Sequence, residues 1–219
     1  TVYGSNANDV IYGGTGNDVL IGGTGNTFFE GGAGADQIVG GVNSTGTNVN
    51  TASYAGSSAG VTVNLVTGTG TGGDAQGDQL SNIQNLRGSA FSDTFVANAA
   101  VNRLDGGSGG SDTVSYASSN SAVTVNLVTG TGTGGYAQGD TYTHIQNVIG
   151  SDYNDIFVAS GEANRFDGGS GSNTVSYASS NAGVNVNLQS GVGSGGAAAG
   201  DTYVRIQNVI GTAFNDTFV

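Results

Sequence analysis

Aspartates recur at intervals of nine residues near the start of this 219-residue chain, and regularly spaced carboxylates can converge on a cation. The stretch divides into GSNANDVIY from Gly4, GGTGNDVLI from Gly13, GGTGNTFFE from Gly22 and GGAGADQIV from Gly31. The sixth place of each segment holds Asp9, Asp18, Thr27 and Asp36 in turn. The eighth place is apolar throughout, with Ile11, Leu20, Phe29 and Ile38.

Glycine-rich turns around these aspartates supply a second set of oxygen ligands. Glycine permits backbone angles that turn successive carbonyls toward one point, and the aspartate adds a carboxylate beside them. The chain has no cysteine, so a metal must be held mainly by oxygen. Calcium accepts about six to eight oxygens in tolerant geometry, whereas magnesium requires a strict octahedron, so the pattern predicts calcium. The expected ligands in these turns are Asp9, Gly14, Gly16, Asp18, Gly32, Gly34 and Asp36.

A second, longer period repeats the motif further along the chain. GSAFSDTFV from Gly88, GSDYNDIFV from Gly150 and GTAFNDTFV from Gly211 lie 62 and then 61 residues apart. Inside these units the spacing of nine returns, with one extra residue in GGSGGSD. The additional candidate calcium ligands are Asp93, Asp112, Asp155, Asn164, Asn173 and Asp216. Where asparagine replaces aspartate the ligand loses its charge, so calcium affinity is expected to fall.

Each nonapeptide is expected to form a turn followed by a very short strand whose central residue, the eighth, points inward. If two nonapeptides make one coil, Asp18 stacks about 4.8 Å from Asp36, one strand spacing away. The same arithmetic pairs Asp93 with Asp112, Asp155 with Asn173, and Asp9 with Thr27. Stacked carboxylates repel one another without a cation, so folding is expected to be coupled to calcium binding.

GGTGNDVLI and GGAGADQIV resemble the GGxGxDxUx nonapeptide of the RTX (repeats-in-toxin) family. The resemblance covers residues 4 to 39 and returns as single turns near 88 to 115, 150 to 176 and 211 to 219. It implies an all-β fold, a right-handed parallel β-roll or β-solenoid with several Ca²⁺ ions between stacked Gly-Asp turns. It also implies a bacterial protein exported by type I secretion, and the long units are similar to those of large surface proteins of that family.

The two periods predict how the chain is organised. A nonapeptide β-roll is expected over 1–48, followed by long repeats over 49–110 and 111–172 and a truncated long repeat over 173–219, all in one continuous solenoid. The chain stops inside a motif that continues in both earlier copies, so it is interpreted as a segment of a longer protein.

Several repeated residues outside the nonapeptide match have more than one interpretation. Asp78, Asp140 and Asp201 each follow a glycine and could complete an additional cation site or cap a turn. Asp105 and Asp167 hold a ninth place, where an outward side chain could reach an ion or face water. The VTVNL and VNVNL segments alternate like half-buried strands. Tyr54, Tyr116 and Tyr177 are expected to pack on the solenoid rather than stack against a ligand.

Composition argues against several classes of function. Sixteen acidic residues against four arginines and no lysine give a net charge of −12, which opposes nucleic-acid binding. The chain has no apolar run long enough to span a bilayer. His144 is the only histidine, and Glu30 and Glu162 are the only glutamates, so general acid–base catalysis has few residues to use. The chain is not expected to be an enzyme.

The predicted function is that of a calcium-binding structural repeat segment in a secreted protein of the bacterial cell surface, such as an adhesin, a surface-layer protein or an extracellular filament component. The alternative is a calcium-dependent folding and secretion module attached to a secreted protease, lipase or alginate epimerase. Expected partners are calcium and either further copies of the chain, since solenoid ends expose strand edges, or a cell-surface glycan.

Overall fold

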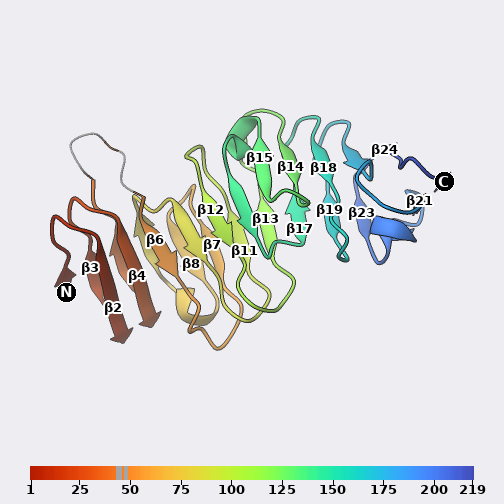
Figure 1. Cartoon of the computed structure of the whole chain (residues 1–219). Coiled ribbons are helices and arrows are strands. Elements are labelled where there is room, and N and C mark those ends of the chain that lie inside the picture. The colour runs from red at the N-terminus through yellow and green to blue at the C-terminus, as the bar shows by residue number, and fades with distance from the viewer. Residues whose placement is uncertain (43–45, 47–48) are drawn as a thin grey trace.

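Short strands stack into two long sheets that run along an elongated molecule (Figure 1). The structure is a computed structural model and describes residues 1–42, 46 and 49–219. The boundary expected at residue 48 lies outside the described residues. Within the described residues, one sheet has 14 strands and is called sheet A, and the other has 11 and is called sheet B.

Sheet A contains β1 (Val2–Tyr3), β3 (Val19–Ile21), β5 (Gln37–Val39), β9 (Gln79–Ser81), β8 (Thr69–Thr71), β7 (Thr62–Asn64), β11 (Thr94–Val96), β13 (Thr113–Ser115), β17 (Asn147–Ile149), β19 (Arg165–Asp167), β23 (Thr202–Val204), β22 (Val192–Ser194), β21 (Asn185–Asn187) and β25 (Thr217–Phe218), in that spatial order. Sheet B contains β2 (Asp9–Thr15), β4 (Thr27–Ala33), β6 (Thr51–Ser53), β10 (Asn85–Arg87), β12 (Arg103–Asp105), β16 (Thr141–Thr143), β15 (Thr131–Thr133), β14 (Thr124–Asn126), β18 (Ile156–Val158), β20 (Thr174–Ser176) and β24 (Asn208–Ile210).

Three 3₁₀ turns, η1 (Gly73–Ala75), η2 (Gly135–Ala137) and η3 (Gly196–Ala198), are the helical elements of the described chain. None of them is long or apolar enough to cross a membrane.

Successive nonapeptides alternate between the two sheets, so two of them complete a coil, as the spacing predicts. β3 pairs with β5 in parallel, with Leu20 opposite Ile38, and β2 pairs with β4, with Ile11 opposite Phe29. The inward residues expected from the sequence are buried, at 4% exposure for Ile11 and 1% or less for the other three. The fold is therefore a parallel β-roll with one inward apolar residue in each short strand.

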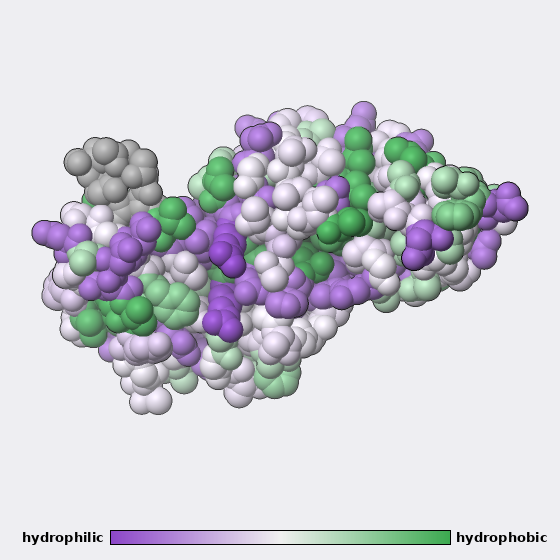
Figure 2. Space-filling view, in the orientation of Figure 1, coloured by the Kyte–Doolittle hydropathy of each residue, from purple (hydrophilic) through white to green (hydrophobic). Residues whose placement is uncertain are grey.

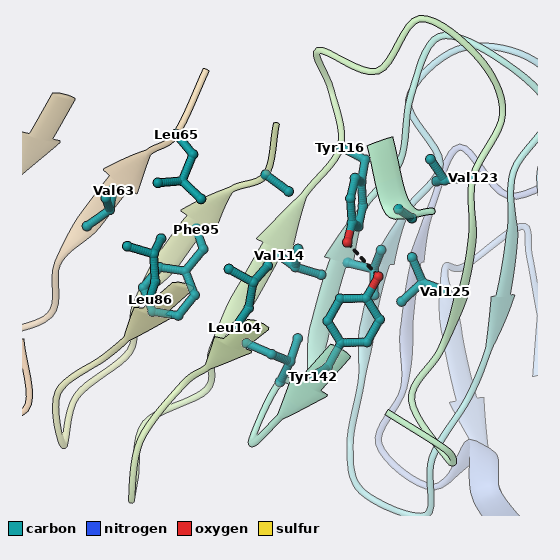
Figure 3. Close-up of a cluster of buried hydrophobic side chains, with 14 of the residues drawn as sticks. Val63, Leu65, Leu86, Phe95, Leu104, Val114, Tyr116, Val123, Val125 and Tyr142 are labelled. Carbon is teal, nitrogen blue, oxygen red and sulfur yellow. Dashed lines mark hydrogen bonds between the residues drawn. The ribbon is translucent and has the colours of Figure 1, made fainter. Parts of the chain in front are cut away.

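The core is a narrow column between the sheets. Figure 3 shows its middle, where Leu86, Phe95, Leu104 and Val114 follow one another from alternate sheets. Further along, the rings of Phe157 and Phe166 stack with centroids 5.6 Å apart. A column this narrow buries little apolar surface per residue, so the coils require additional interactions between them.

Each long repeat adds a three-stranded meander. In the first repeat β7 is followed by β8, which lies antiparallel between β7 and β9, and η1 connects β8 to β9. The expected strand residues Val61, Val63 and Leu65 are buried, with exposures of 1%, 0% and 9%. The equivalent meanders are β14–β15–β16 and β21–β22–β23.

The meanders alternate between the two sheets. The first lies in sheet A, the second in sheet B and the third in sheet A again. The reason is that each long repeat makes an odd number of passes between the two sheets. From β6 to β12 the chain visits sheets B, A, B, A and B when the meander is counted once, so the next repeat begins at β13 in sheet A. Successive long repeats are therefore related by about half a coil.

Replacement of Phe157 by alanine tests the column. The side chain is fully buried and stacked on Phe166, so we expect a loss of about 3–5 kcal/mol in the free energy of unfolding. Phe91→Ala is the control because Phe91 is 47% exposed, and a loss below about 1 kcal/mol is expected there. Urea unfolding at fixed calcium measures both, and equal losses would contradict the arrangement.

Candidate calcium sites

The sixth residue of a nonapeptide ends a turn and lies directly before a strand or at its first position, and its side chain folds back under its own turn. Asp36 illustrates this geometry. A Cβ atom added to Gly31, the first residue of that turn, would lie 2.2 Å from Asp36 Oδ2. The first glycine of the motif is thus required for space, because the carboxylate occupies the place of a side chain.

Aspartates of neighbouring coils are joined by hydrogen bonds from backbone to carboxylate. The Asp18 N–H donates to Asp36 Oδ1 at 2.8 Å, and the Asp36 N–H donates to Asp78 Oδ1 at 2.8 Å. These three residues therefore form a stack along the side of the roll, one above the other. Asp18 and Asp36 lie side by side, as the period of two nonapeptides predicts.

The same hydrogen bond recurs along the molecule, and we call the series the sixth-position ladder. In each rung the backbone N–H at the sixth position of one coil donates to the side-chain oxygen at the sixth position of the next, over 2.7 to 3.0 Å. The accepting residues are Asp36, Asn50, Asp78, Gln84, Asp93, Asp112, Asp140, Gln146, Asp155, Asn173, Asp201, Gln207 and Asp216.

The ladder contains three of the four predicted pairs and also residues that the nonapeptide motif did not identify. The Asp93 N–H donates to Asp112, and the Asp155 N–H donates to Asn173. Asp9 lies opposite Thr27 in register. Asn164 donates its N–H to Asp201, an aspartate that the sequence analysis left outside the nonapeptide match.

Asn50 and the glutamines Gln84, Gln146 and Gln207 were missed by the sequence analysis. Each directly precedes a three-residue strand, in the way that aspartate does elsewhere. The recurrence of Ile-Gln-Asn at the same place in all three long repeats was the available signal for the glutamines.

Aspartates that follow a Gly-Ser or Gly-Thr pair have hydrogen-bonded carboxylates. Asp93 accepts the Val61 N–H and the Ser89 N–H, both at 2.7 Å, and also contacts Ser89 Oγ at 3.0 Å. The same backbone N–H and hydroxyl donors occur at the other three aspartates, where Ser5 donates to Asp9, Ser151 to Asp155 and Thr212 to Asp216. Both oxygens of these carboxylates have donors from the protein itself.

Aspartates that follow a Gly-Gly pair lack that hydroxyl group. Asp36 Oδ2 and Asp112 Oδ2 are buried and have no hydrogen-bond partner among the described residues. An unpartnered buried carboxylate oxygen is costly unless a cation faces it. The residue after the first glycine therefore separates the sixth-position aspartates of the RTX-like turns into two classes.

Burial and neighbouring charge disfavour the ionised form of Asp36 and Asp112 when no cation is bound. Burial raises the pKa of Asp36, and the charges of Asp18 and Asp74 add to the shift. Burial, with a contribution from the charge of Asp93, raises the pKa of Asp112 to about 6. A divalent cation beside these oxygens would reverse the effect.

The turns around Asp18 and Asp36 fit calcium. Gly14, Gly16, Gly32 and Gly34 have φ values of +103°, +97°, +89° and +142°. At Gly32 both the positive φ and the available space exclude a side chain. An added Cβ would lie 1.9 Å from the Gly14 carbonyl oxygen. In the described part of the chain, no group of three or more acidic or histidine side chains could hold a metal ion. Two stacked carboxylates and the backbone carbonyls of these turns are the oxygen donors available, and this mixed set suits calcium.

The aspartates of the long repeats that follow a glycine outside the motif cap turns inside the molecule. Asp140 accepts the Asn102 N–H at 2.7 Å and the Tyr116 hydroxyl at 2.7 Å, and it is 1% exposed. Asp78 and Asp201 make the same contacts with Tyr54 and Tyr177. Each is the sixth residue of an unrecognised nonapeptide, such as GYAQGDTYT from Gly135.

The repeated tyrosines lie in the core rather than on the outer surface of the roll. Tyr116 is fully buried, and its hydroxyl lies 2.5 Å from that of Tyr142, as the dashed line in Figure 3 marks. Tyr177 makes the corresponding contact with Tyr203. The hydroxyl groups of these tyrosines donate to the buried aspartates of the meanders. The tyrosines therefore lie at the end of a series of ladder hydrogen bonds and do not form a surface for a ligand.

Asp105 and Asp167 face cationic or titratable side chains of the following repeat. Asp105 Oδ1 lies 2.9 Å from His144 Nδ1, and Asp167 pairs with Arg205. His144 and Arg205 have positive φ values of 54° and 52°, at equivalent positions after a strand. These contacts explain the two aspartates as links between repeats.

A scan against family models finds the RTX calcium-binding nonapeptide repeat in four copies, over residues 1–29, 28–43, 82–114 and 147–181. Together the copies cover slightly more than half of the chain. The chain belongs to this family. RTX nonapeptide repeats bind calcium ions, so Ca²⁺ is the cofactor of this chain. The search of curated proteins finds no match to it.

The RTX copies coincide with the stacked turns and leave out the meanders. The first two contain Asp18 and Asp36, the third contains Asp93 and Asp112, and the fourth contains Asp155 and Asn173. Repeats of this family typically occur in secreted bacterial proteins and are structural rather than catalytic.

The buried aspartates of the meanders predict an acid-dependent contribution to stability. Burial raises the pKa of Asp140 to about 6, although the Tyr116 hydroxyl opposes the shift. The folded state therefore binds this proton more tightly than the unfolded state. The contribution of protonated Asp140 to the free energy of unfolding is complete below the ordinary pKa of about 4, and it is lost as the pH rises through about 6.

Carboxyl ¹³C NMR in saturating calcium measures this pKa. We expect a resonance that titrates near pH 6 and disappears in Asp140→Asn, while Asp152→Asn, at an exposed position, retains it. Titration of the Asp140 resonance below about pH 4.5 would contradict the assigned burial.

Proposed function

We propose that this chain is a calcium-folded structural repeat segment of a secreted bacterial surface protein, such as an adhesin, a surface-layer protein or an extracellular filament component. The observation that carries the proposal is the pair of sheets that passes without interruption through every long repeat. The divisions at 1–48, 49–110, 111–172 and 173–219 are then repeats within one solenoid. Such an array extends by adding units, which suits a spacer or lattice component.

We further propose that calcium binds first where a Gly-Gly aspartate is stacked on another aspartate. One site lies between the turns of Asp18 and Asp36, and a second includes Asp93 and Asp112. The unpartnered oxygens of Asp36 and Asp112 support this assignment. Asp9, Asp155 and Asp216 hold the coil through their serine or threonine partners and contribute less to calcium binding. Asn164 and Asn173 lack a charge and serve as ladder members.

Calcium at these sites neutralises stacked carboxylates and thereby permits the coil to close. The oxygens of Asp18 and Asp36 and the carbonyls of their turns would hold the ion. Because the unfolded chain has no assembled site, the free energy of calcium binding contributes to folding. Low intracellular and high extracellular calcium would then delay folding until after export.

The alternative function is a folding and secretion module attached to a secreted enzyme. The unbroken nonapeptide series over residues 4 to 39 favours it, because it is the part of the chain that requires no meander. In the structure this series continues directly into the long repeats through β5 and β9, which favours the surface-protein proposal. A catalytic domain adjoining the segment in the full-length protein would support the alternative.

Circular dichroism during a calcium titration, with magnesium as the control, tests calcium-dependent folding. We expect a cooperative gain of β structure in calcium and little change in magnesium. Light scattering at saturating calcium then reports assembly into a lattice or fibre. A β spectrum that is independent of calcium would overturn the proposal that calcium folds the roll.

Two matched substitutions test the two classes of aspartate. Asp36→Asn removes a charge from the unpartnered class, and we expect calcium affinity at one site to fall at least about tenfold. Asp155→Asn changes a carboxylate already held by Ser151, so the number of calcium ions bound should stay the same. Isothermal titration calorimetry measures both, and an equal loss in the two variants would contradict the assignment.

A further inference from the structure

In the part of this acidic chain that the structure describes, two arginines have no carboxylate partner. Arg165 and Arg205 both lie near Asp167. Arg87 and Arg103, by contrast, have no carboxylate within 4.0 Å among the described residues, and both are exposed. With a net charge of −12, the chain has many acids that could have paired with them.

Arg87 and Arg103 point outward from neighbouring strands of sheet B. Arg87 stands opposite Asp105 in register, and Arg103 stands opposite Asn85. The two arginines are therefore diagonal neighbours, with Cα atoms roughly 8 Å apart by strand spacing and rise. Asp105 is already engaged, because its Oδ1 contacts His144 and accepts the Gly107 N–H at 3.2 Å.

A hollow of about 240 Å³ lies beside these guanidinium groups. It is lined by Phe28, Thr51, Asn85, Leu86, Arg87, Arg103 and Asp105. The outward residues of β6 are small, so the surface falls between the Phe28 side chain on β4 and the arginines on β10 and β12. The face seen in Figure 2 likewise has hydrophobic and strongly hydrophilic side chains close together.

The lining combines three kinds of contact. The guanidinium groups bind a carboxylate through paired hydrogen bonds. The Phe28 ring offers an apolar wall, and the amide of Asn85 and the carboxylate of Asp105 offer partners for hydroxyl groups. A simple anion such as sulfate would use the arginines alone and would leave Phe28 and Asn85 without a contact. A polyhydroxylated ring with one carboxylate uses all three.

We propose that this hollow binds a sugar residue that carries a carboxylate, such as a uronic acid in an extracellular polysaccharide. The volume lies below the roughly 300–1,000 Å³ of sites for drug-sized ligands, so it accommodates a single residue of a longer glycan. The proposal does not depend on the calcium assignment, because none of the residues that line the hollow belongs to a proposed calcium site.

The next long repeat provides a natural comparison. Arg103 corresponds to Arg165, but Arg165 lies 3.8 Å from Asp167, and Ile149 stands where the first repeat has Arg87. The second repeat thus has the same strands without the two unpaired guanidinium groups. Arg165→Gln is accordingly a matched control for substitutions in the first repeat.

Titration of the calcium-saturated chain with a galacturonate trisaccharide tests the proposal, with the methyl-esterified trisaccharide as the neutral control. We expect binding of the acid alone. Arg87→Gln combined with Arg103→Gln should weaken it at least about tenfold, because two charge-assisted contacts are lost, whereas Arg165→Gln should not. Isothermal titration calorimetry in excess calcium gives the affinities.

The other outcomes each overturn the proposal. Equal binding of the esterified sugar, or an unchanged affinity in the double variant, would exclude recognition through these arginines. Equal binding of sulfate would show a general anion site. Reduced self-association of the double variant in light scattering, without sugar binding, would assign the hollow to an acidic surface of a second copy. An unaltered calcium titration by circular dichroism confirms that the double variant folds and separates these results from failure of the calcium proposal.

Discussion

Stability of this molecule depends on coupling between coils that bury very little. Each short strand contributes one inward side chain, so hydrophobic burial per residue is small and the next coil must be held by other means. The sixth-position ladder provides that coupling. A hydrogen bond from a backbone N–H to a carboxylate contributes about 1.5–3 kcal/mol, and the rungs that end on an aspartate repeat it along the roll. It also satisfies backbone donors at the turns, where no strand partner is available.

The ladder also creates the electrostatic problem that calcium solves. Placing an aspartate at the sixth position of consecutive coils brings like charges together, as in the stack of Asp18, Asp36 and Asp78. The chain uses several remedies. Asparagine and glutamine replace aspartate at many rungs, serine or threonine donates to the carboxylate at others, and a tyrosine hydroxyl serves the buried meander aspartates. Among the described residues, Oδ2 of Asp36 and Oδ2 of Asp112 have none of these partners, and a calcium ion would supply positive charge there.

Much of this arrangement was predictable because the short period is strict. The nonapeptide spacing predicted the inward positions of Leu20 and Ile38, the stacking of Asp18 on Asp36 and the pairing of Asp155 with Asn173. The position of Asp140 was less accessible, because its nonapeptide begins Gly-Tyr and follows an antiparallel strand that no period signals. The burial of Tyr116 depends on that same aspartate, and it could not be inferred from the tyrosine alone. Neither could the hollow beside Arg87, since it requires that β6, β10 and β12 be neighbours.

The half-coil offset between long repeats bears on the shape of a longer array. Each complete long repeat of the described chain contributes four strands to one sheet and three to the other, and the excess changes sides with every repeat. An excess always on the same side would make one edge longer and bend the solenoid into an arc. Because the extra strand alternates between the sheets, the two sheets have equal numbers of strands after every two repeats, in the manner of a twofold screw axis. At roughly 4.8 Å per strand, this pattern has a period of about 34 Å. A long array built on this rule is a straight rod that displays its meanders on opposite faces in turn.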